Sequence, residues 1–205
     1  MRVGVFGGTF DPPHLGHLII AEEAREALGL QRVLFVPARL PPHKAPVGPA
    51  AARLELCRAA VAGHPAFEAC DLELRRAGPS YTVDTLAALG GEDPATELFC
   101  LLGSDSAVEL HTWHDPSRLY ALATFVALVR PGWPRERIGA WLQGQHPRPR
   151  LQVLAVPGIG IASSLVRERV AAGRSIRYLV PEPVRALIEA HGLYREGGGR
   201  PAGGL

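Results

Sequence analysis

The sequence lacks several features that would place it in well-known classes of protein. Its three cysteines, Cys57, Cys70 and Cys100, are scattered and form no CxxC pair, which argues against a disulfide framework and a zinc knuckle. The 22 basic and 20 acidic side chains leave a formal net charge of +2, too small to gather nucleic acid by itself. The Arg-rich stretch around Arg148 and Arg150 is expected to be a solvated loop. These absences favour a protein of the reducing cytoplasm that binds no nucleic acid.

Long hydrophobic runs and the common nucleotide-binding motifs are missing as well. The first residues run directly into Val3–Gly8 without a basic leader, and no apolar run approaches the length that spans a bilayer. There is no GxxxxGK(S/T) motif, which excludes a P-loop protein, and Gly158–Gly160 alone is a weak fragment of a dinucleotide-binding fingerprint. We therefore expect a soluble protein that contacts no membrane.

What the sequence does contain is an alternation of apolar, β-branched runs with segments of helical period. This alternation is typical of βα units that build a mostly parallel sheet. The 205 residues fit one domain with a short appended piece. We predict an α/β, Rossmann-like, doubly wound fold over residues 1–157, a small C-terminal helical subdomain over 158–195, and a flexible, Gly-rich tail over 196–205.

The expected elements follow from this patterning and from glycines at the ends of helices. The predicted strands are Arg2–Phe6, Val33–Val36, Phe67–Leu72, Glu97–Leu102, Phe125–Val129 and Leu151–Val156. The predicted helices are His14–Leu28, Ala51–Ala62, Thr82–Leu89, Asp105–Leu110, Glu136–Gln143, Ser163–Ala172 and Pro183–Ala190.

The most informative stretch, Gly7–His17, lies where the first predicted strand meets the first predicted helix. In open α/β sheets, ligands bind at such carboxyl ends of strands. Gly7 and Gly8 lack a Cβ, so the backbone can take positive φ and admit a phosphate group closely. Pro12 and Pro13 fix the approach to the helix, whose free N–H groups and dipole attract an anion. The stretch therefore predicts a phosphate site.

His14 and His17 are spaced i, i+3, so both imidazoles should rise from one face of the first helical turn. Gly16 between them would let a ligand sit close. Two imidazoles can donate hydrogen bonds to phosphate oxygens and stabilise the charge that develops as pyrophosphate leaves. A zinc pair is not favoured, because an HExxH pair needs i, i+4 spacing and a further ligand. The alternative is an ordinary turn in which both histidines only cap and pack the helix.

A second anion site is predicted at the start of the C-terminal helical piece. Ser163 and Ser164 place hydroxyls at a helix start, where one of them is expected as the N-cap. Arg167 is i+4 from Ser163 and shares its face, where the guanidinium could grip two phosphate oxygens. With the glycine loop, this site would hold a triphosphate from both ends, so that residues 158–195 complete an ATP site.

These two motifs occur together in a known family. The chain resembles the bacterial nicotinate-nucleotide adenylyltransferases, members of a nucleotidyltransferase superfamily marked by a (T/H)xGH sequence after the first strand, here His14–His17. The resemblance covers nearly the whole chain and extends to Pro41–Lys44, Ser80–Leu86, Leu102–Asp105, Trp113 and Ile176–Pro181. It implies transfer of the adenylyl group of ATP to nicotinate mononucleotide in NAD biosynthesis, with pyrophosphate released and Mg²⁺ arriving on the ATP phosphates.

The resemblance also implies a role for individual residues. The ATP site would be lined by Gly7, Gly8, Thr9, Phe10, His14, His17, Gly103, Asp105, Ile161, Ser163 and Arg167. The mononucleotide site would be formed by Lys44, Tyr81, Thr82 and Trp113. In chemical terms, Trp113 can stack on a pyridine ring, and the Thr82 hydroxyl can donate to a carboxylate. The catalytic residues would be His14, His17 and Arg167, and no metal ligand from the protein is expected.

Each assignment made through the resemblance has a plainer interpretation. Without the resemblance, an aromatic such as Trp113 is more often a core or surface residue. Lys44 is equally interpretable as a solvated loop lysine, Asp105 as a helix N-cap, and the Tyr81–Thr82 pair as a strand end. Lys44 would lie near phosphate, and Asp105 would bind a ribose hydroxyl. The sequence departs from the family pattern at Ala162, where the family usually has a hydroxyl, and at Leu165, where it usually has a polar residue.

Several alternatives stay open at the level of sequence. An enzyme of the same class could prefer nicotinamide mononucleotide or accept both mononucleotides. A non-catalytic nucleotide-binding module could use the same fold, although a sensor has no need of the paired His14 and His17. A phosphopantetheine adenylyltransferase is disfavoured because such chains are shorter and lack the Ser80–Leu86 stretch. The sequence leaves assembly into a homo-oligomer open.

Overall fold

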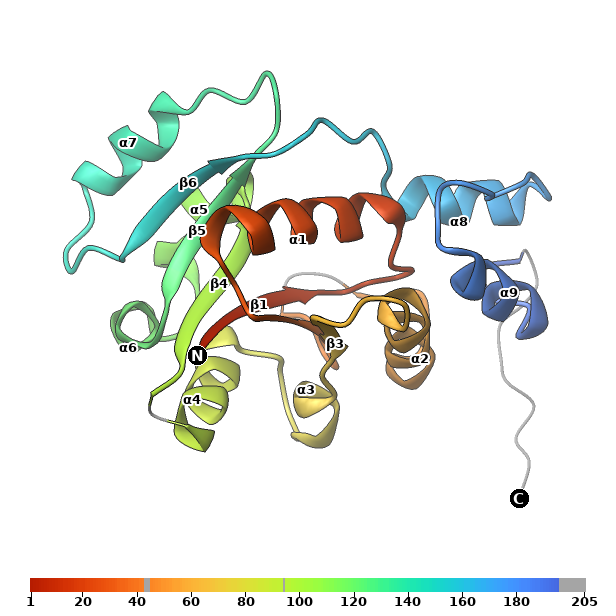
Figure 1. Cartoon of the computed structure of the whole chain (residues 1–205), viewed down its shortest axis with the longest axis horizontal. Helices are drawn as coiled ribbons and strands as arrows, with labels where there is room; N and C mark the ends of the chain where they lie inside the picture. The colour runs from red at the N-terminus through yellow and green to blue at the C-terminus, as the bar shows by residue number, and fades with distance from the viewer. Residues whose placement is uncertain (43–44, 94, 196–205) are drawn as a thin grey trace.

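A computed structural model describes residues 1–42, 45–93 and 95–195 of the chain. In this part, six parallel strands form one sheet in the order β3-β2-β1-β4-β5-β6 (Figure 1). The strands are β1 (Arg2–Gly8), β2 (Arg32–Pro37), β3 (Phe67–Ala69), β4 (Glu97–Gly103), β5 (Thr124–Val129) and β6 (Leu151–Ala155). The predicted doubly wound fold is confirmed, and the order reverses at β1, where β2 and β4 lie on either side.

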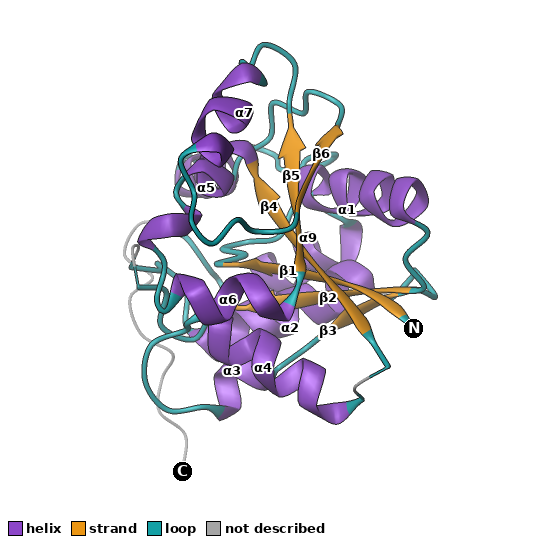
Figure 2. Cartoon of the chain, turned by 90° about the vertical axis from the view of Figure 1, so that its left-hand side faces the viewer, coloured by secondary structure: helices purple, strands orange, loops and turns teal. Residues whose placement is uncertain are grey.

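Helices cover both faces of the sheet (Figures 1 and 2). One face packs against α1 (Leu15–Leu28) and α2 (Ala50–Val61). The other face packs against α4 (Thr82–Glu92), α5 (Ser104–Val108), α6 (Pro116–Leu122) and α7 (Glu136–Gln143).

The core follows from the alternation of side chains along the strands. In β4, Leu98, Cys100 and Leu102 join the cluster beneath α4 to α7, whereas Phe99 and Leu101 join the cluster beneath α1 and α2. A parallel strand buried on both faces needs apolar residues at nearly every position. This requirement explains the continuous apolar runs of the sequence and places β1 and β4 in the rigid centre of the molecule.

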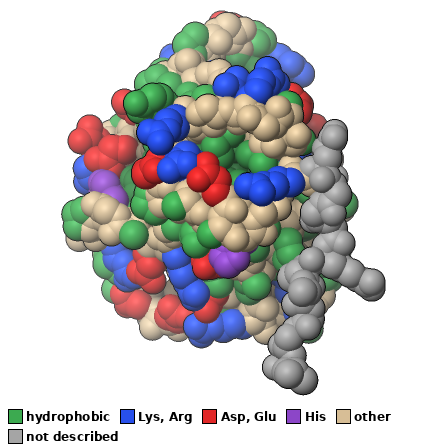
Figure 3. All heavy atoms as spheres, turned by 90° about the vertical axis from the view of Figure 1, so that its right-hand side faces the viewer, with side chains coloured by type: hydrophobic (Ala, Val, Ile, Leu, Met, Phe, Trp, Pro, Cys, Tyr) green, Lys and Arg blue, Asp and Glu red, His purple; other side chains and the backbone are tan. Residues whose placement is uncertain are grey.

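The C-terminal helices α8 (Ser163–Ala171) and α9 (Glu182–Ala190) lie at one end of the molecule, beyond α1 and α2 (Figure 1). They have a small core of their own, in which Val166, Val184 and Ile188 pack with Leu56 of α2. This face of the molecule mixes basic and acidic side chains (Figure 3), and Arg185 forms ion pairs with Glu182 and Glu189.

Two local predictions were wrong or incomplete. The strand predicted over Phe67–Leu72 ends at Ala69, and Leu72–Arg75 forms the short helix α3. Arg75 forms an ion pair with Asp71, four residues earlier, and this local pair favours a helical turn over a strand. Helix α6 was not predicted, although Asp115 caps it and Pro116 occupies its first turn, which is a recognisable start signal.

The remaining elements match the prediction to within a few residues at their ends. Helix α1 ends at Gly29, which has the expected left-handed backbone with φ of 60°. The helix predicted over Asp105–Leu110 is split into α5 and the 3₁₀ turn η1 (Leu110–Thr112). Within the described residues, every helix is too short or too polar to cross a bilayer.

Candidate active site

The glycine loop, residues 7–13, connects β1 to α1 at the carboxyl end of the sheet. The positive φ expected at Gly7 or Gly8 occurs instead at Phe10, with φ of 47°. The ring of Phe10 folds back beneath the loop, and a Cβ on Gly8 would lie only 3.1 Å from it. Gly8 is therefore needed for close packing inside the loop. A Cβ on Gly7 would meet nothing within 4 Å.

The side chain of Phe10 belongs to the core and not to an open ligand site. It is 3% exposed and packs against Phe6 and Phe35, with ring centroids 5.6 Å from each. Only the backbone of Phe10 is left to contact a nucleotide. The side chain instead supports the loop from below, which makes its shape rigid before any ligand arrives.

The two histidines lie side by side at the start of α1. His14 is the N-cap and His17 is the third helical residue; their rings are stacked, with centroids 3.7 Å apart and planes inclined by 25°. The backbone N–H of His14 donates to Nδ1 of His17 at 3.2 Å. A neutral His17 therefore carries its proton on Nε2, which becomes its donor for a ligand.

Burial keeps both imidazoles neutral near pH 7. It lowers the pKa of His14 to about 4, and burial together with the neighbouring His14 lowers the pKa of His17 to about 3. Among the described residues, Nδ1 of His14 is buried without a hydrogen-bond partner. The expected space above Gly16 is taken by protein, because a Cβ there would lie 3.0 Å from Nδ1 of His14 and 3.1 Å from Ile159.

Helix α8 meets the glycine loop directly, as the two-site prediction requires. The Ser163 hydroxyl donates to the carbonyl of Pro12 at 2.8 Å, and Nη1 of Arg167 donates to the carbonyl of Asp11 at 2.6 Å. The N-cap of α8 is Ala162, so the expectation of Ser163 or Ser164 in that place was wrong. The serine is instead one residue further on, where its hydroxyl can reach the loop.

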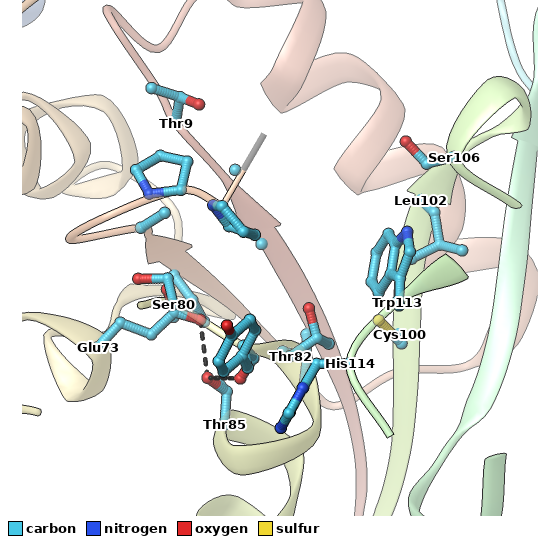
Figure 4. A pocket seen from close by; sticks show the side chains of 18 of the residues that line it. Thr9, Glu73, Ser80, Thr82, Thr85, Cys100, Leu102, Ser106, Trp113 and His114 are labelled. Atoms are coloured by element: carbon cyan, nitrogen blue, oxygen red, sulfur yellow. Dashed lines mark hydrogen bonds between the residues drawn. The ribbon is translucent and has the colours of Figure 1, made fainter. Parts of the chain in front are cut away.

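The residues predicted for the pyridine end gather around a cavity of about 520 Å³ that also reaches the glycine loop. Tyr81 caps α4, Thr82 begins it, and the half-buried Trp113 follows η1. Figure 4 places Thr9 and Trp113 on different sides of this cavity. Gly7, Gly8, Thr9, Tyr81, Thr82 and Trp113 all line it, so the structure brings these predicted residues together.

Other predicted residues lie apart from this cavity or outside the described chain. Gly103 ends β4 and caps α5, while the exposed Asp105 accepts a hydrogen bond from the indole N–H of Trp133 at 2.9 Å. Gly103 and not Asp105 is thus the N-cap. Ile161 is half-buried against the small core of α8 and α9. Lys44 lies outside the described residues.

Sequence reasoning missed three side chains of the cavity wall. His114 stacks on Tyr81 with ring centroids 4.1 Å apart, and its position next to Trp113 was the available signal. Glu73 is 7% exposed and accepts a hydrogen bond from the Thr85 hydroxyl at 2.7 Å. This pair fixes α3 against α4 behind the cavity; Glu73 lies just after the segment that was predicted as strand, and Thr85 lies in a predicted helix.

The sequence analysis also missed a buried arginine that holds the glycine loop. Arg53 of α2 is fully buried and donates to the carbonyls of Thr9 at 2.8 Å and Gly48 at 3.1 Å. Burial lowers the pKa of its guanidinium. Its place among the apolar residues of α2, three before Leu56, was a signal that this charge points inward.

In residues 1–42, 45–93 and 95–195, no three His, Cys, Asp or Glu side chains lie close enough to hold a metal ion together. The three cysteines are free.

Comparison with known proteins agrees with this architecture. Residues 5–169 match the model of the cytidylyltransferase-like family. Among solved structures, the Plasmodium falciparum nicotinic acid mononucleotide adenylyltransferase complexed with NaAD is similar, with a TM-score of 0.77 and 18% identity over 94% of this chain and 97% of that one. A putative nicotinate-nucleotide adenylyltransferase from Vibrio parahaemolyticus has a TM-score of 0.65 and 21% identity over 95% of this chain and 96% of that one. At these identities, the likeness concerns the fold.

Closer relatives are found among curated proteins. The chain is 50% identical to the probable nicotinate-nucleotide adenylyltransferase of Thermus thermophilus, over 95% of this chain and 100% of that protein. It is 48% identical to the protein of the same name from Exiguobacterium sibiricum, over 95% of this chain and 99% of that protein. With this identity over nearly its full length, and with the glycine loop, paired histidines and α8 motif in one place, the chain belongs to the nicotinate-nucleotide adenylyltransferase family.

Proposed function

We propose that this protein transfers the adenylyl group of ATP to nicotinate mononucleotide, forming nicotinate adenine dinucleotide and pyrophosphate as a step of NAD biosynthesis. One observation carries the proposal. The cavity of about 520 Å³ extends from the glycine loop to Tyr81, Thr82 and Trp113, so this loop and an aromatic, hydroxyl-bearing pocket share one space. Two nucleotides can therefore meet there with their phosphates together.

On the ATP side, the glycine loop and the start of α1 supply donors for the phosphates. The free N–H groups and the positive dipole end of α1 favour an anion next to His14 and His17. Arg167 and Ser163 reach this loop from α8, so the C-terminal piece brings a guanidinium to the same place. We assign Gly103, Asp105 and Ile161 to the nucleoside part of ATP.

The reaction needs positioning and charge stabilisation more than proton transfer. A phosphate oxygen of the mononucleotide attacks the α-phosphorus of ATP and forms a P–O bond. The bond from the α-phosphorus to the bridging oxygen breaks, and its electron pair leaves with pyrophosphate. His17 donates through Nε2–H to the charge that develops, and the neighbouring His14 ring supports it, as expected of preorganised donors in a water-poor site.

On the mononucleotide side, Trp113 stacks on the pyridine ring and α4 binds its carboxylate. The Thr82 hydroxyl lies at the first helical position, where the free N–H groups of α4 also point to the cavity end of the helix. A helix N-terminus favours a carboxylate over a neutral amide, which supports nicotinate over nicotinamide as the preferred base. Tyr81 forms the adjacent wall, and Lys44 is assigned to the phosphate.

Mg²⁺ enters, in this proposal, bound to the phosphates of ATP. Mg²⁺ is commonly bound through substrate phosphates and a few protein ligands, which supports a cation that the substrate carries. The ion neutralises phosphate charge, and Arg167 and the two histidines act on the oxygens that remain. Removal of free Mg²⁺ with a chelator should stop the reaction, and its return should restore the original rate without refolding.

The organisation of the chain completes the proposal. Residues 1–157 form the Rossmann-like nucleotidyltransferase domain and 158–195 the helical piece that completes the ATP site; α8 and α9 pack on this domain through a small core that they share with α2. The tail over 196–205 lies outside the described residues.

We place the protein in the cytoplasm, where its three free cysteines stay reduced. A homo-oligomer stays a prediction, which sedimentation would test.

One assay separates this function from its alternatives. Pyrophosphate release is measured with ATP and Mg²⁺ and either nicotinate mononucleotide or nicotinamide mononucleotide. The proposal predicts a higher kcat/KM with the nicotinate substrate. A higher value with the amide would assign the rival specificity, and silence with both would favour a non-catalytic nucleotide-binding module.

A further inference from the structure

A buried carboxylate lies in the middle of the glycine loop. Asp11 is 3% exposed, and its oxygens accept hydrogen bonds from the backbone N–H groups of Val47, at 2.7 Å, and Gly48, at 3.1 Å. A third donor comes from the other end of the chain, because the Tyr194 hydroxyl donates to Oδ1 of Asp11 at 2.7 Å. A carboxylate that is taken out of water needs such donors, so each of them constrains the loop.

The backbone of the same loop is held as firmly as the Asp11 side chain. The carbonyls of Thr9, Asp11 and Pro12 each accept a hydrogen bond from a side chain of α2 or α8. Pro12 is followed by Pro13 and then by His14, the N-cap of α1. Any shift of Asp11 is therefore passed within three residues to the stacked histidine pair.

The space around Asp11 and Tyr194 is filled closely. A Cβ added to Gly48 would lie 2.7 Å from Oδ1 of Asp11, which is too close for a real side chain, and 3.2 Å from the Tyr194 oxygen, which is a tight contact. Burial and the neighbouring Asp11 raise the pKa of Tyr194, so its hydroxyl keeps the proton that it donates. We call the contact of Asp11 with Val47, Gly48 and Tyr194 the Asp11–Tyr194 junction. In this arrangement the Asp11 carboxylate and the groups that donate to it are all paired.

We propose that Tyr194 is a positioning residue for the reaction, which acts through Asp11 to hold the glycine loop that leads into His14 and His17 at the start of α1. The inference rests on the proposed function, in which the two histidines stabilise the charge that develops on the leaving pyrophosphate. It extends the site to the segment after α9, a part of the chain to which neither the motifs nor the cavity wall points.

The position of the junction determines which kinetic constant it affects. Tyr81 and Thr82 lie at the start of α4 and Trp113 follows η1, and no hydrogen bond among the described residues joins them to Asp11 or Tyr194. Loosening the loop should therefore reduce the rate of the chemical step and leave binding of the mononucleotide alone. A general loss of structure would instead change both kcat and the KM for the mononucleotide.

The test is Tyr194→Phe in the full chain, which removes one hydroxyl and keeps the ring. We expect kcat to fall about 10- to 100-fold, as for a small misplacement of catalytic groups, while the KM for nicotinate mononucleotide changes by less than about twofold. The matched control is Tyr178→Phe in the same C-terminal piece, where the tyrosine is 85% exposed, and its kinetics should equal those of the unchanged protein. An unchanged kcat in Tyr194→Phe, or an equal loss in the control, overturns the proposal.

A double-mutant cycle tests whether Tyr194 acts through Asp11. If it does, Tyr194→Phe costs nothing further in a chain that already carries Asp11→Ala, whereas independent effects on kcat would multiply and contradict the proposal. Should Asp11→Ala fail to fold, Asp11→Leu replaces it, because a side chain of similar shape fills the space and offers Tyr194 no acceptor. Thermal unfolding of each variant identifies such a failure.

Amide hydrogen exchange separates the failure of this inference from the failure of the proposed function. Peptides that cover residues 9–17 and 45–49 should exchange faster in Tyr194→Phe than in Tyr178→Phe, whatever reaction the protein catalyses. Absence of pyrophosphate release from the unchanged protein would reject the proposed function. Equal exchange in the two variants would reject the junction as the element that holds the loop.

Discussion

The backbone N–H of His14 donates to Nδ1 of His17, and this one bond decides how the second ring can serve a ligand. It leaves Nε2 of His17 as the protonated nitrogen, because a neutral imidazole carries only one N–H. The histidine pair is thus a set of fixed, neutral donors and not a pair of cations.

The first prediction concerns His17 itself. His17→Ala should lower kcat by about 100-fold or more, the loss typical of removing one donor to a transition state, while circular dichroism stays unchanged. The control is His191→Ala, because His191 is 51% exposed and lies near Glu55, on the surface of α9 and α2. A near-normal rate in His17→Ala would refute its catalytic role.

The second prediction is a loss of stability in acid that the histidine pair causes. Each ring has a folded pKa below the unfolded value of 6.5, about 4 for His14 and about 3 for His17. At a pH between the folded pKa of a ring and the unfolded pKa of 6.5, the unfolded chain binds more protons than the folded chain. The rings therefore leave the free energy of unfolding unchanged above about pH 6.5 and lower it as the pH falls below this value. The slope is about 1.4 kcal/mol per pH unit for each ring.

Urea unfolding between about pH 7.5 and pH 5 measures this effect, because the slope per proton sets the expected difference. The double variant His14→Asn/His17→Asn should lose less stability over this interval than the unchanged protein. Comparing the two chains removes the contribution of the other titrating groups. Identical slopes would show that these imidazoles are not protected from protonation.

The third prediction concerns Arg167. Arg167→Ala should raise the KM for ATP or strongly lower kcat without unfolding the protein, because it removes a charge that α8 brings to the glycine loop. Arg174→Ala is the matched control, since Arg174 is exposed just beyond the same helix. Unchanged kinetics in Arg167→Ala would remove this residue from the site.

The fourth prediction tests the pyridine end of the cavity. Trp113→Ala should raise the KM for nicotinate mononucleotide about tenfold and change the KM for ATP far less, since a lost aromatic stack costs about 0.5–1.5 kcal/mol beyond the buried area. Trp141→Phe is the control, because Trp141 contacts His111 and takes no part in the cavity wall. Equal effects on the two substrates would contradict the assignment.

The fifth prediction uses the tight fit at Gly48. Gly48→Ala should destabilise the protein by about 1–3 kcal/mol, as overpacking a filled site does, and should lower activity with it. Gly63→Ala places its Cβ where nothing lies within 4 Å and should leave stability nearly unchanged. Chemical denaturation of the two variants gives the comparison, and equal stabilities would show that the site can relax.

The connection between β1 and α1 could be predicted from the sequence because its signals are local. Glycines and prolines restrict or free the backbone within one or two residues, so Gly7–His17 and the stop at Gly29 needed no knowledge of the fold. The alternating apolar runs likewise predicted the parallel sheet, since burial on both faces leaves little choice of residue. The family resemblance added Tyr81, Thr82 and Trp113, which the fold brings to one cavity.

Other parts of the site could not be predicted, because they depend on contacts between distant segments. Arg53 reaches Thr9 across 44 positions, and Tyr194 reaches Asp11 across 183. No periodicity or spacing encodes such pairs. The shift of positive φ from the glycines to Phe10 depends in part on such a contact, since the ring packs against Phe35 of β2 as well as against Phe6.

The bond between Tyr194 and Asp11 has a consequence for biosynthesis on the ribosome. A growing chain makes Asp11 with its first strand, yet the phenol that completes its surroundings is added 183 residues later. Until then the carboxylate can be buried only with a donor missing, which penalises premature closure of the loop. A nascent or clipped polypeptide that stops before residue 194 should therefore keep this loop open to water, although its sheet can already form.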